Sequence, residues 1–97
     1  MTNAAVQQRI AENSRTDPET LEHLSHHDSA DVRAAVAGNL KAFKSTVDSL
    51  ANDLNPDVRY SMAEDANTST ELLARLAVDD NPYVQDRAMR TQARLKL

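Results

Sequence analysis

The chain has 97 residues, of which 40% are hydrophobic and 27% charged, and its net charge is −4. This length suits one small domain, and no apolar run reaches the roughly 18 residues of a transmembrane helix. With no cysteine and one glycine, the sequence excludes disulfides, thiolate metal sites, thiol catalysis and glycine-rich phosphate loops. The acidic balance and only three aromatic residues argue against nucleic-acid binding. Because an apolar leader is also absent, we expect a cytoplasmic protein without a membrane segment.

The chain repeats itself every 26 residues. Valine recurs at this spacing along its whole length, at Val6, Val32, Val58 and Val84. Residues 29–54 and 55–80 share seven identical positions without any insertion. We therefore predict a single repeat domain over residues 1–97, with units at residues 3–28, 29–54 and 55–80 and a capping segment at residues 81–97.

The first half of each unit is predicted to form a short helix. It begins after a residue type that caps helix N-termini, and these residues share one position of the repeat: Asn3, Ser29, Asn55 and Asn81. Proline suits the first helical position and follows the cap in two units, at Pro56 and Pro82. The helix is expected to end near residues whose side chains satisfy backbone groups of the next turn, Asn13, Asn39 and Asp65.

A second short helix is predicted to begin at Thr16 in the first unit and at Thr68 in the third. A glutamate follows three residues later in both units, which is the spacing of a capping box. The second unit has Ala42 at this position, so its turn should differ, with Ser45 and Asp48 as a displaced cap. No segment alternates in the manner of a strand, so we expect no sheet.

Helices this short are unstable alone and must bury their apolar faces against neighbouring units, as in a solenoid. The buried residues are expected to include Val32, Val36, Leu50, Val58, Met62, Leu73 and Leu76. The last helix should cover the open end of the third unit with three residues of one face, Val84, Ala88 and Leu95.

Two stretches of the sequence resemble repeats of the leucine-rich repeat variant family. Its pattern Val-Arg-x-x-Val-Ala-x-Asn is matched by residues 32–39, and its pattern Thr-x-x-x-Leu-Leu-x-x-Leu-Ala-x-Asp by residues 68–79. Residues 50–59 also resemble HEAT repeats, whose units are longer, at ~40 residues. The resemblance implies an all-α fold: a short right-handed α-solenoid of about three 26-residue two-helix repeats plus a C-terminal capping helix. It leaves open whether the second helix of each unit is α or 3₁₀, and it implies no shared chemistry.

Metal-ligating residue types are densest between Glu22 and Asp28. His23 and His27 lie four residues apart, on one face of a helix. The repeat, however, places both at positions that other units fill with solvent-exposed types, and Glu22 faces away from the pair. We therefore expect a solvated helix end, with no metal site and no cofactor.

Arg33 and Arg59 occupy one position of the repeat, and Asp53 and Asp79 another. The arginines could form a row for an anionic partner, or they could pair with aspartates of adjacent turns or cap carbonyls between units. Their recurrence with the repeat favours the structural role. No serine or histidine lies in a nucleophile turn, so we expect no catalytic residue and no enzyme.

The charge of the chain is distributed unevenly. Residues 1–84 contain 7 basic and 14 acidic side chains, whereas residues 85–97 contain 4 basic and 1 acidic. Arg87, Arg90 and Arg94 share one helix face, which is either the solvated surface of a cap or a docking face for an acidic partner.

These observations predict a non-catalytic protein-interaction or scaffold module. The expected partner is another protein, or the acidic body of a second copy. The alternative is a nucleic-acid-associated HEAT-like protein that uses the basic C-terminal helix.

Overall fold

The computed structural model describes residues 3–96 and contains seven α-helices and no strand in that range. The helices are α1 (Ala4–Glu12), α2 (Pro18–Leu24), α3 (Ala30–Ala37), α4 (Lys44–Leu50), α5 (Pro56–Glu64), α6 (Thr70–Leu76) and α7 (Pro82–Leu95). This confirms the all-helical prediction. It also shows that the short helices α2, α4 and α6 are α-helices rather than 3₁₀-helices.

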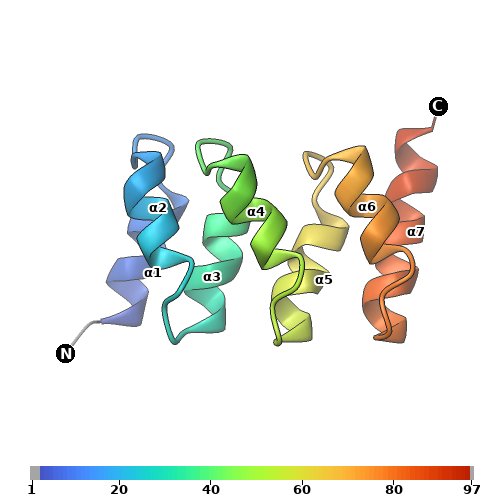
Figure 1. Ribbon diagram of the computed structural model, residues 1–97, viewed down its shortest axis with the longest axis horizontal. Coiled ribbons are helices and arrows are strands. Elements are labelled where there is room, and N and C mark those ends of the chain that lie inside the picture. The colour runs from blue at the N-terminus through green and yellow to red at the C-terminus, as the bar shows by residue number, and fades with distance from the viewer. Residues whose placement is uncertain (1–2, 97) are drawn as a thin grey trace.

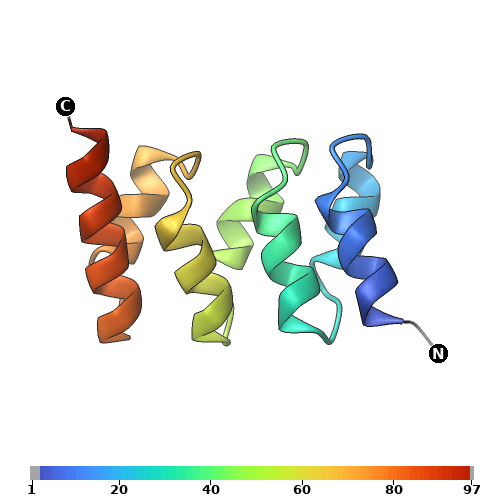
Figure 2. The same cartoon turned by 180° about the vertical axis from the view of Figure 1, so that it is seen from behind.

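The helices stand side by side in two rows along the long axis of the molecule. Helices α2, α4 and α6 form the nearer row in Figure 1, and α1, α3, α5 and α7 form the nearer row in the reverse view of Figure 2. The molecule measures 41 × 23 × 19 Å, and the first helix, α1, and the last helix, α7, lie at opposite ends of its long axis. The closest packing runs along the odd-numbered row, from α1 to α3, α5 and α7.

The odd-numbered helices begin where the sequence predicts. Four side chains cap them by accepting hydrogen bonds from first-turn N–H groups: Asn3, Ser29, Asn55 and Asn81. Pro56 and Pro82 then occupy the first helical position, where proline's lack of an N–H removes no helical hydrogen bond. The helices α1, α3 and α5 end near the predicted residues Asn13, Asn39 and Asp65.

The predicted caps of the second helices are wrong by one residue. Asp17 caps α2 and Ser69 caps α6, each through its side-chain oxygen. The hydroxyls of Thr16 and Thr68 instead donate to carbonyls six residues earlier, at 2.6 and 2.7 Å. Each threonine therefore fixes its turn to the end of the preceding helix.

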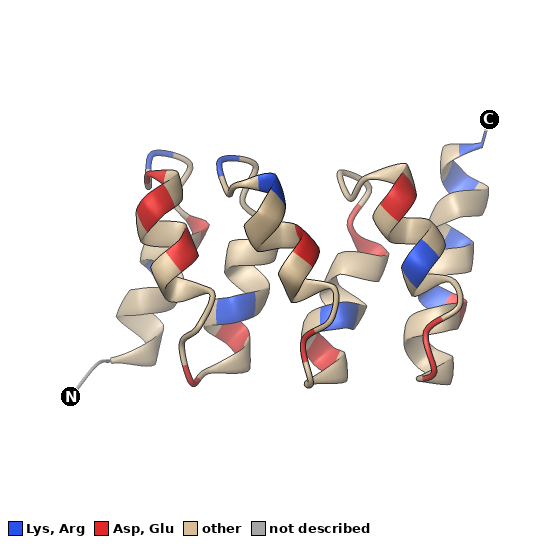
Figure 3. Ribbon diagram, in the orientation of Figure 1, with Lys and Arg blue, Asp and Glu red and all other residues tan. Residues whose placement is uncertain are grey.

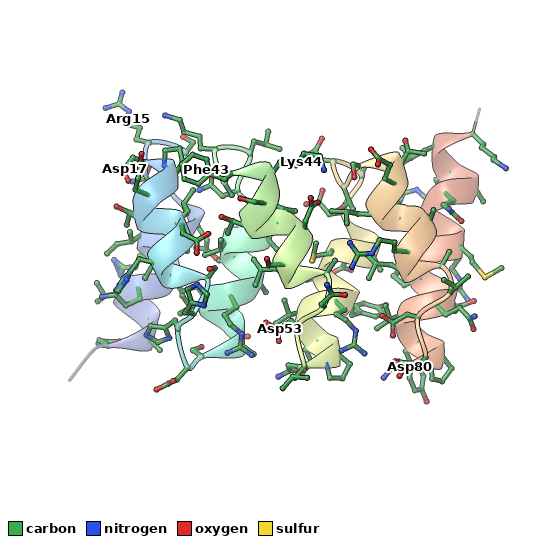
Figure 4. All side chains as sticks on the ribbon, in the orientation of Figure 1. Arg15, Asp17, Phe43, Lys44, Asp53 and Asp80 are labelled. Atoms are coloured by element: carbon green, nitrogen blue, oxygen red, sulfur yellow. The ribbon has the colours of Figure 1, made fainter. Side chains whose placement is uncertain are left out.

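The turn before α4 differs from the other two, as predicted from Ala42. Phe43 precedes α4 without a side-chain cap, and the expected displaced cap at Ser45 and Asp48 is wrong. Asp48 instead forms an ion pair with Lys44 one helical turn earlier, at 2.9 Å. In Figure 4, Phe43 and Lys44 lie at the same edge of the molecule as Asp17 at the start of α2.

The seven residues expected in the core are all buried: Val32, Val36, Leu50, Val58, Met62, Leu73 and Leu76. Val84 and Ala88 of α7 are buried as well, as predicted. Leu95 is 51% exposed, and its predicted burial is wrong. It is the last residue of a 14-residue helix, and the final turn of α7 extends past the 9-residue α5 beside it.

Candidate functional site

Two arginine–aspartate pairs hold loops against the odd-numbered helices. Nε and Nη2 of Arg33 donate to the two carboxylate oxygens of Asp53 at 2.8 and 3.1 Å. Nη1 of the same arginine donates to the carbonyls of His27 and Asp28 at 2.8 and 3.0 Å. One guanidinium thus joins α3 to the loops on both sides, which confirms the structural role predicted for it.

Arg59 repeats this arrangement one unit later. It donates to both carboxylate oxygens of Asp79 at 2.9 and 3.1 Å and to the Asp53 carbonyl at 2.6 Å. Burial raises the pKa of Asp53 and Asp79, but hydrogen bonds from the arginines and from backbone N–H groups outweigh it. The pKa of each carboxyl therefore lies below its ordinary value. Both arginines are committed to contacts within the chain.

Two polar side chains bridge consecutive odd-numbered helices. Asn39 Nδ2 donates to the carbonyls of Ala11 and Asn13 at 2.8 and 3.0 Å. At the other end of the row, Thr91 Oγ1 donates to the Ala63 carbonyl at 2.6 Å. The sequence predicts that Asn39 serves its own turn, which it does by accepting from a backbone N–H. The bond to the preceding helix was not anticipated, although Asn39 and Thr91 occupy the same position of the 26-residue pattern.

The side chains of the histidine-rich segment form hydrogen bonds within the chain. Glu22 accepts from the buried Thr46 hydroxyl at 2.6 Å and lies 3.0 Å from His26 Nε2, and these two hydrogen bonds lower the pKa of Glu22. His27 Nδ1 accepts from the Ser29 N–H at 2.9 Å. Between residues 3 and 96, no group of three or more histidine, aspartate or glutamate residues is placed to hold a metal ion.

His27 makes the same kind of hydrogen bond to the backbone as the aspartates at its repeat position in the later loops. The Asp53 and Asp79 carboxylates each accept from a backbone N–H two residues later, as the His27 ring nitrogen does. The repeat position shared by these three residues explains the substitution. It assigns His27 a structural role at the start of α3.

The three arginines predicted as a partner site lie along α7, where basic positions follow one another in Figure 3. Arg90 is exposed and forms an ion pair with Asp86 at 3.0 Å, and Arg94 is exposed. Arg87 is half-buried, so the expectation that all three face water is wrong for this residue. It borders the buried stripe of α7, being three residues after Val84. Its Nε is the only buried side-chain nitrogen or oxygen without a hydrogen-bond partner among residues 3–96.

A shallow groove lies between α5 and α7. It has a volume of about 150 Å³ and is lined by Pro56, Asp57, Tyr60, Asn81, Tyr83 and Val84. Tyr83 precedes Arg87 by one helical turn on the same face of α7, and Arg90 and Arg94 follow about two and three turns after Tyr83. The sequence gives no sign of the groove, because the two tyrosines are far apart in the chain and fall at different positions of the repeat.

A second groove lies beside α4. It has a volume of about 260 Å³ and contains Lys44, Asp48, Asp65 and Asn67 together with the apolar side chains of Ala42, Val47 and Leu72. In Figure 4, Lys44 marks its position at the edge formed by the turns. Lys44 pairs with Asp48, and Asp65 accepts from the Asn67 N–H, so these polar groups make contacts within the chain.

Comparisons with protein-family models, with curated proteins and with solved structures found no match for this chain. None of the helices between residues 3 and 96 combines the length and the apolar character needed to cross a bilayer.

Proposed function

We propose that this chain is a short α-solenoid of about three 26-residue repeats, at residues 3–28, 29–54 and 55–80, capped by α7. Helices α1, α3, α5 and α7 begin 26 residues apart, which supports this division. The pairs Arg33–Asp53 and Arg59–Asp79 recur at the same spacing with the same geometry. The chain would then be a cytoplasmic member of the leucine-rich repeat variant type, right-handed as that resemblance implies.

As its activity we propose non-catalytic protein binding through the C-terminal end of the stack. The observation that carries this is one face of α7, on which Tyr83, Arg87, Arg90 and Arg94 follow at helical spacing, with Tyr83 sharing a groove with Tyr60. Tyrosine and arginine are the residue types most enriched in the energetic centres of protein interfaces. Because the arginines carry the positive charge of this end, the partner is an acidic segment of another protein.

A labelled peptide rich in glutamate and tyrosine, titrated with the protein and followed by fluorescence anisotropy, tests this proposal. Replacing Arg87, Arg90 and Arg94 by glutamine should weaken binding at least about tenfold, or about 1.4 kcal/mol. The variant should stay folded, since Arg90 and Arg94 are exposed and contribute little to stability, and circular dichroism checks the effect of replacing the half-buried Arg87.

The matched control removes three exposed positive charges elsewhere, in the variant Arg9→Gln, Arg15→Gln and Lys41→Gln. It produces the same change of net charge but leaves α7 intact, so its affinity should stay within a factor of about two. Equal losses in both triple variants would show that net charge alone drives binding, and would refute the site.

A duplex DNA probe in the same assay tests the alternative, a nucleic-acid-associated protein. The four basic side chains in residues 85–97 favour it. A DNA-binding protein must lose affinity steeply as salt rises, because each phosphate contact releases counterions. Tighter binding of the duplex than of the peptide, with that salt dependence, would replace protein binding as the proposed function.

A further inference from the structure

The N-terminal edge of the odd-numbered row leaves one apolar position uncovered. Val32, Val58 and Val84 occupy this position on α3, α5 and α7 and are fully buried, because each of these helices packs on the one before it. Val6 occupies the same position on α1 and is 47% exposed. Among residues 3–96 no helix precedes α1, so Val6 lacks the helix contact that buries its three counterparts.

At the C-terminal edge, α7 exposes the face with which α1, α3 and α5 each contact the following odd-numbered helix. Ala11 on α1 and Ala63 on α5 are fully buried, and the bonds from Asn39 and Thr91 to their carbonyls place the following helix directly against them. Met89 occupies this position on α7 and is 54% exposed, with no further helix beyond it among residues 3–96. The two ends of the row thus present the two sides of a contact that the molecule forms internally three times.

Residues 3–96 contain no even-numbered helix after α7, but most of such a contact does not require one. Between neighbouring units the odd-numbered helices make the largest contacts, from α1 through α3 and α5 to α7, and the even-numbered helices add smaller ones, from α2 to α3 and from α6 to α7. An α1 that follows α7 could therefore make most of the contacts found at an internal junction.

The charges of the two ends are complementary. Residues 3–28 contain two basic and five acidic side chains, whereas residues 81–97 contain four basic and one acidic. Opposite charges steer the N-terminal end of one copy toward the C-terminal end of another and oppose contacts between like ends.

We infer that the protein self-associates head to tail, with the Met89 edge of α7 on one copy packed against the Val6 edge of α1 on a second copy. This rests on the proposed repeat stack. On an ideal helix at about 100° per residue, Met89 lies about 200° from Arg87 and about 100° from Arg90, so the contact uses the flank of α7 opposite Arg87 and next to Arg90. Such a contact joins unlike surfaces, so it adds copies in an open row rather than closing a symmetric dimer.

Sedimentation velocity of the full chain at increasing concentration and low salt tests this inference. The weight-average mass should rise above the 10.7 kDa of one chain and fall back as salt is added. Val6→Glu and Met89→Glu should each remain monomeric, because each places a charge in the apolar contact. The control Leu54→Glu, at a loop residue that is 97% exposed, should associate like the unchanged protein.

Mixing the two end variants distinguishes head-to-tail contact from a symmetric one. Met89→Glu keeps an intact α1 edge and Val6→Glu keeps an intact α7 edge, so an equal mixture should form dimers and nothing larger. Recovery of the dimer also shows that both variants are folded, which circular dichroism checks independently.

A protein that stays monomeric at every concentration would overturn the inference, as would a Val6→Glu variant that dimerises alone. Both end variants retain Arg87, Arg90 and Arg94 and should still bind the acidic peptide of the previous section. Loss of self-association with peptide binding retained, or the reverse, therefore separates failure of this inference from failure of the proposed function.

Discussion

Asp65 does not bridge to the preceding odd-numbered helix, whereas Asn39 and Thr91, its counterparts at the same repeat position, do. Asn39 and Thr91 donate hydrogen bonds from this position, to Ala11 and Ala63. The carboxylate of Asp65 has only acceptors there, and its Oδ2 lies close to Gly38, 3.9 Å from where a β-carbon on that residue would be. Among residues 3–96, no hydrogen bond reaches the Ala37 carbonyl, which corresponds to those of Ala11 and Ala63.

Replacing Asp65 by asparagine should therefore stabilise the protein. The new amide can donate to the Ala37 carbonyl while its oxygen keeps the bond from the Asn67 N–H. One added hydrogen bond contributes about 0.5–1.5 kcal/mol to the free energy of unfolding, measured by urea denaturation. The reverse change, Asn39→Asp, should destabilise, because it places a carboxylate against the carbonyls of Ala11 and Asn13. An unchanged or lower stability of Asp65→Asn would show that the junction between α3 and α5 has no unmet acceptor.

At the scale of elements, the arginine–aspartate pairs determine how the loops lie against α3 and α5. Both pairs have two hydrogen bonds and little exposure, and Asp53 lies with Asp80 at the edge opposite the turns before α2 and α4 (Figure 4). In Figure 3 the loops before α3, α5 and α7 carry acidic segments next to the basic residues of the helices. The chain thus uses charge to fix loops, and its apolar side chains to pack helices.

Because of these pairs, the free energy of unfolding should depend on pH in the acid range. The pKa of Asp53 and Asp79 lies below the unfolded value of about 3.9. Their contribution is therefore complete above that value and is lost as pH falls through the lower folded pKa. The melting temperature should fall steeply below about pH 4. A variant with Asp53→Asn and Asp79→Asn should melt lower at pH 7 but lose less on acidification. Parallel curves for the two proteins would mean that other carboxyls cause the acid sensitivity.

The helix starts show how far local sequence determines an element. Asparagine or serine before proline or alanine identifies the starts of α1, α3, α5 and α7, because the cap bonds only to its own first turn. Before α2 and α6, threonine and the next residue are both capping types, and the sequence alone favours the wrong one. The threonine hydroxyl instead donates to a carbonyl six residues earlier. That carbonyl comes within hydrogen-bonding distance only when the turn has formed.

For the whole molecule, the 26-residue period predicts the buried residues well but the ends poorly. Every internal unit has the same neighbours, so a residue's position in the period predicts its burial. At α7 that rule fails for Met89, which is 54% exposed although Ala63 at the same position is fully buried, because no further helix packs on it among residues 3–96. The exposure of Leu95 and the partial burial of Arg87 follow the period, because Ser69 is exposed and Ser61 is half-buried at the same positions. The groove of Tyr60 and Tyr83 does not follow it, since neither tyrosine recurs at its repeat position.

The proposed role of α7 as a cap leads to a prediction about truncation. Removing the chain after residue 83 deletes Val84, Ala88 and Thr91, which are buried against α5 and α6. The apolar faces of those helices would then meet water, so light scattering should detect aggregation and urea denaturation a large loss of stability. Removing only the residues after 92 keeps the buried contacts and discards Leu95, which is half exposed, so that shorter chain should remain monodisperse and nearly as stable. If both truncations were equally harmful, the last turn of α7 would contribute to the core in a way that its exposure contradicts. If neither were harmful, α5 and α6 would be stable without a cap, and the stack would not need α7 to protect its end.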